Sequence, residues 1–264
     1  MTVEERSTTL ASELAKAERT VHPVGQLTLA GDLSLAEAYA VQLAGVAQRA
    51  DQGDPVVGLK LGFTSREKAR QMGVHDVILG VLTGAMDLGG QPRIVRGRLI
   101  HPRIEPEVAF RLGPGAAEVD LTDPRVSLLD QVTHVAAAVE VIDSRYRDFR
   151  FSLEDVVADN TSAARFAVGT WVPIDEVRHR ISSLPVSLRA NGEVIAEGNT
   201  AAILGNPLAT LVAVQRLAAE HGHPLPASAV VLAGAATPAV VMTPGVTYDV
   251  EVTGLGGVSV RVEE

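Results

Sequence analysis

The first fifty residues place apolar side chains at the three- and four-residue spacing of amphipathic helices. This spacing runs through residues 4–20 (EERSTTLASELAKAERT) and again through residues 34–53 (SLAEAYAVQLAGVAQRADQG). Ser34 and Glu37 have the spacing of a capping box, which predicts that the second helix begins there. A helical N-terminal segment over residues 1–55 is therefore expected.

After residue 55 the pattern changes to β-branched residues, glycines and turns. Alternating or continuous apolar runs predict strands within residues 56–65, 98–112, 134–145, 185–198 and 229–263. Asn191-Gly192 predicts a tight hairpin turn, because both turn positions need a positive φ. A second hairpin is expected around residues 254–257. Strands therefore dominate the larger part of the chain.

Helices are few in this part. Residues 206–222 predict a helix that begins near Asn206 and ends at Gly222, and residues 66–73 predict a shorter one. Because strands do not alternate regularly with helices, the expected fold class is α+β with an antiparallel or mixed sheet. We expect a β-rich catalytic domain over residues 56–264 that forms one continuous unit with the helical segment 1–55.

Composition excludes several function classes. The chain has 264 residues, of which 46% are hydrophobic and 21% charged, so it can build a large core. The net charge of −9 and the absence of basic runs argue against nucleic-acid binding. There is no cysteine, which excludes thiol catalysis and thiolate metal sites. Without a signal peptide pattern or a membrane-spanning apolar run, a cytoplasmic protein is expected, with no membrane contact.

Three glutamates stand in apolar surroundings. Glu105 and Glu107 flank Pro106, so on a strand both carboxylates lie on one face and repel each other. Glu140 interrupts an apolar run, where a buried carboxylate needs a partner. The simpler interpretation of the first pair is a solvated strand face. The alternative is a site for Mg²⁺ or Mn²⁺, which prefer oxygen ligands. Pro106 predicts a sheet edge or a bulge at this point.

Lys60 is a lone charge in the apolar run VVGLKLGF. Its default interpretation is an edge-strand lysine that reaches into solvent. The functional interpretation is a proton-transfer lysine in a glycine-lined site near a metal. The polar stretch ADNTSAARF, which contains Ser162 and Arg165, is by itself an ordinary loop, and His101 is interpreted as structural.

Four stretches together resemble a known family: VVGLKLGFTSREKARQMGV, LIHPRIEPEVAFRL, VEVIDSRYRDFRFSLEDVVADNTSAARF and GLGGVSVRV. They resemble the 2-oxopent-4-enoate hydratases and the related 2-oxo-3-hexenedioate (4-oxalocrotonate) decarboxylases of the fumarylacetoacetate hydrolase superfamily, which act in meta-cleavage degradation of aromatic compounds. The resemblance covers nearly the whole chain. It implies a mixed β-roll, a homo-oligomer, and Mg²⁺ or Mn²⁺ held by an E-x-E pair and one further acid.

The resemblance also assigns roles to individual residues: metal ligands Glu105, Glu107 and Glu140, the catalytic lysine Lys60, and pocket residues Thr64, Ser65, Asp76 and Ser162. Arg165 is the expected partner of a distal substrate carboxylate. The residues around it resemble the decarboxylases more than the hydratases, so decarboxylation is expected first and hydration second. Association with the paired hydratase or decarboxylase, a non-catalytic scaffold role, and C–C bond hydrolysis with His101 remain open alternatives.

Overall fold

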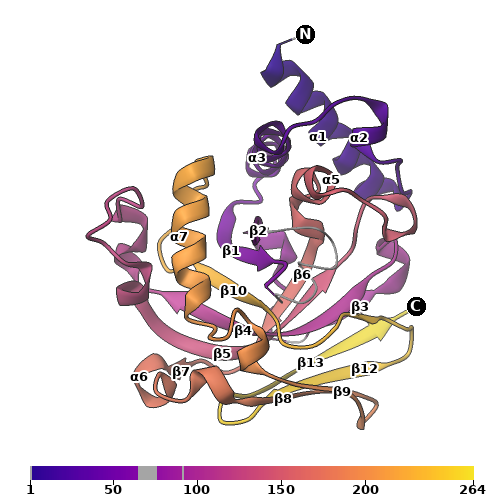
Figure 1. Ribbon diagram of the computed structural model, residues 1–264. Helices are drawn as coiled ribbons and strands as arrows, with labels where there is room; N and C mark the ends of the chain where they lie inside the picture. Colours follow the sequence, from indigo (N-terminus) through magenta and orange to yellow (C-terminus); the bar gives the residue numbers. More distant parts are fainter. Residues whose placement is uncertain (1, 65–75, 91) are drawn as a thin grey trace.

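The computed structural model describes residues 2–64, 76–90 and 92–264, and it places two β-sheets at the centre of the fold (Figure 1). The sequence-predicted helix 66–73 and Ser65 lie outside these described residues. The strands of the larger sheet are β1 (Val56–Gly62), β2 (Ile78–Thr83), β4 (Arg103–Leu112), β5 (Val132–Ile142), β6 (Ala163–Val168), β7 (Val172–Pro173), β10 (Val230–Ala235) and β11 (Val240–Val241). Those of the smaller sheet are β3 (Arg93–Val95), β8 (Pro185–Ala190), β9 (Glu193–Asn199), β12 (Thr247–Val252) and β13 (Gly256–Glu263).

The larger sheet has the order β2-β1-β10-β4-β5-β6, with β11 paired to β4 and β7 to β5. The smaller sheet has the order β3-β13-β12-β8-β9, and its β12 and β13 pack against β5. The pairs β1–β10 and β3–β13 are parallel, whereas the other neighbours are antiparallel. The prediction of an α+β fold with mixed sheets and a helical N-terminal segment is confirmed.

Helices cover the larger sheet on the side away from the smaller one (Figure 1). Helices α3 (Leu35–Asp51), α5 (Leu153–Ala158) and α7 (Ala209–His221) contact its strands, and α1 (Val3–Thr20) and α2 (Leu27–Ala30) pack on α3 and α5 as an outer layer. The short α6 (Ile174–Val177) lies beside β7. Buried residues of α1 and α3 belong to the same hydrophobic cluster as those of β1 and β2. We therefore propose that segments 1–55 and 56–264 form one continuous unit. Among the described residues, no helix is both long and apolar enough to cross a bilayer.

Local sequence signals place several element ends. The Ser34 hydroxyl accepts a hydrogen bond from the Glu37 backbone N–H, and the Glu37 carboxylate accepts one from the Ser34 backbone, which is the predicted capping box. Asn191 and Gly192 have φ of 49° and 86°, as the predicted hairpin between β8 and β9 requires. Helix α7 ends at Gly222 as predicted, but it begins later than Asn206 because Asn206 caps a preceding turn through Leu208 N–H.

The register between β4 and β5 brings the predicted metal ligands together. Glu105 is directly opposite Glu140 across this antiparallel pair. Pro106 does not lie at a sheet edge, because β4 has neighbours on both sides. It lies at a bulge, the other predicted possibility: its carbonyl accepts from Ala236 N–H where the β10 register shifts. A proline is tolerated there because its missing N–H faces the interruption between β10 and β11.

Buried His223 gives the fold a defined pH dependence. Gln42 donates its amide N–H groups to Leu79 O and Val157 O, so its Oε1 accepts from His223 Nε2 at 2.5 Å. Burial, with a smaller effect of nearby His221, lowers the pKa of His223 to about 4. The folded protein therefore resists protonation of an imidazole that takes up a proton at pH about 6.5 when unfolded.

We expect the free energy of unfolding to fall as the pH drops from about 6.5 towards 4, by up to about 3 kcal/mol from this one group. In that window the unfolded chain binds the proton and the folded chain does not, so acid favours unfolding. The measurement is urea unfolding of the wild-type protein and His223→Gln at a series of pH values. Equal pH slopes for the two proteins would contradict this assignment.

Candidate metal centre

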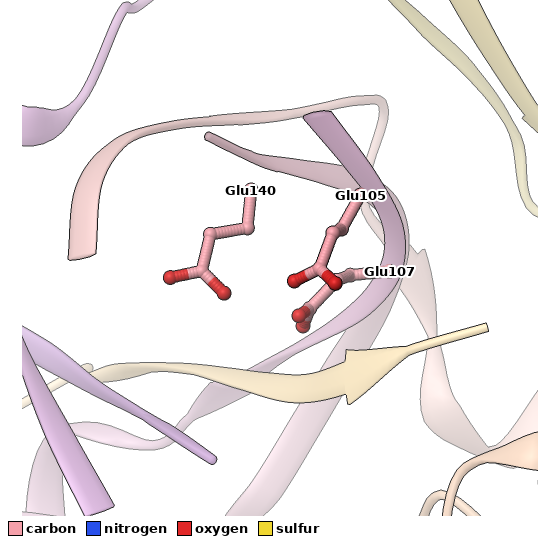
Figure 2. A group of neighbouring side chains, drawn as sticks. All are labelled: Glu105, Glu107 and Glu140. Atoms are coloured by element: carbon pink, nitrogen blue, oxygen red, sulfur yellow. The ribbon is translucent and has the colours of Figure 1, made fainter. Parts of the chain in front are cut away.

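Three carboxylates from two paired strands converge at one point of the larger sheet. Glu105 and Glu107 extend from β4 and Glu140 from β5, and Figure 2 shows their carboxylates turned towards one another. One oxygen from each residue lies within 4.8 Å of the others. The alternation of side chains along β4 puts the first two on one face, and the strand register adds the third.

Burial makes this arrangement costly without a cation. Glu107 and Glu140 are each 1% exposed. Gly234 N–H donates to Glu107 Oε2 at 2.8 Å, whereas Glu107 Oε1 and Glu140 Oε1 have no hydrogen-bond partner among the described residues. Desolvation, and then the neighbouring Glu140 charge, raises the pKa of Glu107 well above its usual value. Desolvation also raises the pKa of Glu140, against the opposing effect of Lys60. The donor set is all oxygen, so it fits a hard divalent cation.

Lys60 lies against this acidic cluster. It comes from β1, an interior strand, and is 2% exposed, so it does not reach into solvent. Its Nζ is 3.0 Å from Glu140 Oε2 in an ionic contact and donates to Thr161 O at 3.2 Å. A Cβ at Gly80, opposite on β2, would be 2.7 Å from Lys60 Cδ and 3.1 Å from Asn160 O. Glycine at position 80 therefore leaves the space that the lysine side chain occupies.

The segment Asn160–Ser162 forms one wall of the site in a strained backbone conformation. All three residues have a positive φ, between 50° and 56°. The Asn160 side chain holds this segment by bonding both Val81 N–H and Val81 O at 2.8 Å, and Thr161 Oγ1 donates to Leu79 O. Ser162 is buried, and its hydroxyl has no hydrogen-bond partner among the described residues. This segment thus contributes an unpartnered hydroxyl at Ser162, one residue after the Thr161 carbonyl that Lys60 contacts.

A pocket of about 440 Å³ opens above the acidic cluster. Its polar lining is Lys60, Thr64, Arg103, Glu105, Thr161 and Ser162, and its aromatic lining is Phe63, Phe149 and Phe151. Thr64 is buried and packs against Gly234, whose φ of 116° requires glycine. The sequence-predicted Lys60, Glu105, Thr64 and Ser162 thus line one cavity, with Glu107 and Glu140 beside it. Its size suits a small organic acid.

Two predicted substrate contacts lie elsewhere. Asp76 is exposed and forms a two-point ion pair with Arg216, at 2.7 and 2.8 Å, outside the pocket lining. Arg165 pairs with Val141 across β5 and β6, so its side chain lies on the face opposite that of Glu140. The charged groups around it are Glu18 and Arg49 of the helical segment, together with Asp143 and Arg145. The structure therefore gives neither residue a contact with this pocket.

Arg103 and Phe149 are among the pocket residues that sequence reasoning missed. Arg103 precedes Glu105 by two positions, so the alternation that paired the glutamates also predicts it on the same face. Phe149 gave no comparable signal. It reaches the pocket because Asp148 and Phe149 both have a positive φ, 59° and 58°, which short sequence patterns do not reveal.

Comparison with known proteins gives matches over most or all of the chain. Residues 75–263 match the family described as fumarylacetoacetate (FAA) hydrolase, C-terminal. A 4-oxalocrotonate decarboxylase of a Pseudomonas species is 42% identical over 95% of both chains. A 2-keto-4-pentenoate hydratase of Burkholderia vietnamiensis is 35% identical over 97% of both. The solved 4-oxalocrotonate decarboxylase of Pseudomonas putida G7, complexed with magnesium and adipate, superposes with a TM-score of 0.89, at 35% identity and 99% coverage of both chains.

Proposed function

The chain belongs to the fumarylacetoacetate hydrolase family, and we propose that it is a metal-dependent lyase that converts 2-oxo-3-hexenedioate (4-oxalocrotonate) to 2-hydroxypenta-2,4-dienoate and CO₂. The observation that carries this proposal is the cluster of three convergent carboxylates in contact with a buried lysine, at the floor of a pocket. Such a cluster suits a 2-keto acid, whose carboxylate and keto oxygens together chelate a hard cation.

Glu105, Glu107 and Glu140 would hold Mg²⁺ or, as the alternative, Mn²⁺. When bound, the cation supplies Lewis-acid stabilisation of the negative charge that develops on the C2 oxygen of the substrate. Mg²⁺ is favoured because the similar decarboxylase of Pseudomonas putida G7 is complexed with magnesium. Glu107 Oε1 and Glu140 Oε1, which have no hydrogen-bond partner among the described residues, are the groups that would accept the ion.

Lys60 is assigned the proton transfer. In the reaction the C5–C6 bond breaks, CO₂ leaves, and the electron pair moves through the C3–C4 alkene onto the C2 oxygen. Lys60 Nζ then donates a proton to that oxygen, which gives the 2-hydroxydiene. Glu140 and Thr161 O hold the ammonium in place, and burial keeps water from competing for its proton. Thr64 and Ser162 are proposed to contact the substrate, because both line the pocket.

Hydration of 2-hydroxypenta-2,4-dienoate to 4-hydroxy-2-oxopentanoate is the second candidate, since similar hydratases align over nearly the whole chain. Decarboxylation is favoured by the higher identity with a decarboxylase. Hydrolysis of a C–C bond has less support, because His101 is not part of the described pocket lining. We also propose a homo-oligomer that associates with the paired enzyme of the pathway. Native mass measurement, alone and with that enzyme, tests this.

The two reactions are separated by one assay. We expect purified protein with Mg²⁺ to release CO₂ from 2-oxo-3-hexenedioate and to lose this activity with EDTA, with Mn²⁺ tested in parallel. Consumption of 2-hydroxypenta-2,4-dienoate without CO₂ would identify the hydratase instead. Absence of turnover with both substrates and both metals would contradict the proposal.

A further inference from the structure

Arg103 is a cation on the pocket wall that neither the metal nor the proposed proton transfer uses. Along β4 it shares a face with Glu105 and Glu107, and both Arg103 and Glu105 line the pocket. Two residues along a strand correspond to about 7 Å. The pocket wall therefore carries a positively charged residue whose backbone position is roughly 7 Å along the strand from that of Glu105, the nearest proposed metal ligand.

An aromatic contact holds the guanidinium of Arg103 without using its N–H groups. Its Cζ lies 4.1 Å from the centre of the Phe149 ring, in a cation–π arrangement. Phe149 is itself packed between Phe151 and His101, with ring centres 5.7 and 5.1 Å away. Because the ring contacts the face of the guanidinium, the N–H donors at its edge stay available for a carboxylate.

The positive charge of Arg103, unlike those of Arg145 and Arg216, is not balanced by a carboxylate of the described residues. Arg145 is paired with Asp159 and Arg216 with Asp76, whereas Arg103 forms no ion pair among the residues that the structure describes. Arg103 is half-buried, and a partly desolvated cation gains most from an anionic ligand that reaches the same pocket. Arg103 thus offers the pocket a binding site for a ligand carboxylate, separate from the proposed metal site at Glu105, Glu107 and Glu140.

We infer that Arg103, held by Phe149, binds the distal carboxylate of a six-carbon dicarboxylate whose keto-acid end lies at Glu105, Glu107 and Glu140. An extended six-carbon chain is comparable in length to the roughly 7 Å that separate Arg103 from Glu105 along β4. This inference rests on the proposed function and identifies the residue that selects dicarboxylates over monocarboxylates. It replaces Arg165 in that role, because Arg165 lies on the opposite face of the sheet.

The inference predicts an unusual split of the kinetic constants. The distal carboxylate leaves as neutral CO₂, so its attraction to Arg103 is strongest in the ground state and weakens towards the transition state. We expect Arg103→Gln to raise KM for 2-oxo-3-hexenedioate about 10- to 100-fold, the range for losing one charge-assisted hydrogen-bonded pair, with kcat not lowered. Arg103→Lys keeps the positive charge but loses the planar guanidinium that can donate two parallel hydrogen bonds. We expect its KM to lie between those of Arg103→Gln and wild type.

A binding measurement tests Arg103 independently of turnover. Adipate and hexanoate, a six-carbon diacid and monoacid, are titrated by calorimetry into the Mg²⁺-loaded protein. We expect wild type to prefer adipate and Arg103→Gln to lose that preference by about 10- to 100-fold. Arg111→Gln is the matched control: Arg111 is also on β4 and also stacks on an aromatic ring, Trp171 at 4.3 Å, but it is outside the pocket lining.

Each outcome separates the two proposals. Equal binding of adipate and hexanoate by wild type would overturn the inference, and so would an unchanged adipate preference in both Arg103 variants. Loss of the preference in Arg165→Ala, with Arg103→Gln unaffected, would return the role to Arg165. If wild type prefers adipate through Arg103 and decarboxylates no keto acid, the inference stands and the proposed function fails.

Discussion

Replacing Glu107 with glutamine is expected to abolish Mg²⁺-dependent turnover while the protein remains folded. The substitution removes one of three carboxylates that would hold the ion, and charge stabilisation by a metal is worth several kcal/mol, so the rate should fall about 10³-fold or more. Glutamine keeps an acceptor for the Gly234 N–H and removes a buried charge next to Glu140. The thermal midpoint of the metal-free protein should therefore not decrease.

The comparison with Glu140→Gln sharpens this prediction. Glu140 is the ion-pair partner of Lys60, and removing it leaves a buried ammonium without its carboxylate. We expect this variant to lose both activity and stability, whereas Glu107→Gln loses activity alone. Calorimetric titration with Mg²⁺ and thermal unfolding of both variants provide the test, with Glu251→Gln, an exposed residue of β12, as the control. Wild-type Mg²⁺ affinity and turnover in Glu107→Gln would refute the metal assignment.

Replacing Lys60 with methionine is expected to lower kcat by about 10²-fold or more and to leave Mg²⁺ binding intact. The change removes the only group assigned to proton transfer, an effect typically worth 10²- to 10⁴-fold. The three carboxylates stay in place, and the loss of a positive charge from their surroundings favours the cation. Metal affinity should therefore stay equal or increase while turnover collapses.

Two further variants separate proton transfer from charge. Lys60→Arg keeps a cation that does not give up a proton near neutral pH, so we expect it to remain impaired. Lys16→Met, on the exposed side of α1, is the matched control for loss of a lysine. Single-turnover measurements with saturating substrate and Mg²⁺ read the chemical step directly. A rate for Lys60→Met within a few-fold of wild type would remove Lys60 from the mechanism.

The features of the fold that the sequence predicted correctly are those that depend only on residues close together in the chain. The capping box of Ser34 and Glu37, the Asn191-Gly192 turn and the end of α7 at Gly222 each follow from contacts within a few residues. The start of α7 was placed too early because a turn and a helix begin with the same residue types. Neither the sheet order nor the packing of β12 and β13 against β5 could be derived from such local patterns.

The candidate site likewise has residues that local sequence patterns place correctly and residues that they do not. Strand alternation placed Glu105 and Glu107 on one face, and the same rule would have found Arg103. Arg165 was assigned to the substrate by its positive charge and its place in TSAARF, and neither says which face of β6 carries its side chain, which lies opposite that of Glu140. The family resemblance suggested Asp76 as a pocket residue, and in this structure its carboxylate pairs with Arg216.

The sequence by itself determined which residue types can bind a hard cation, which strands carry them and which local turns form, because these depend on side-chain chemistry and backbone preferences within short segments. Only the tertiary structure decided that Glu140 lies opposite Glu105, that Lys60 contacts Glu140, and that Arg103 faces the same pocket. The physical reason is that strand register and sheet order are set by packing among residues far apart in the chain, which no single segment specifies.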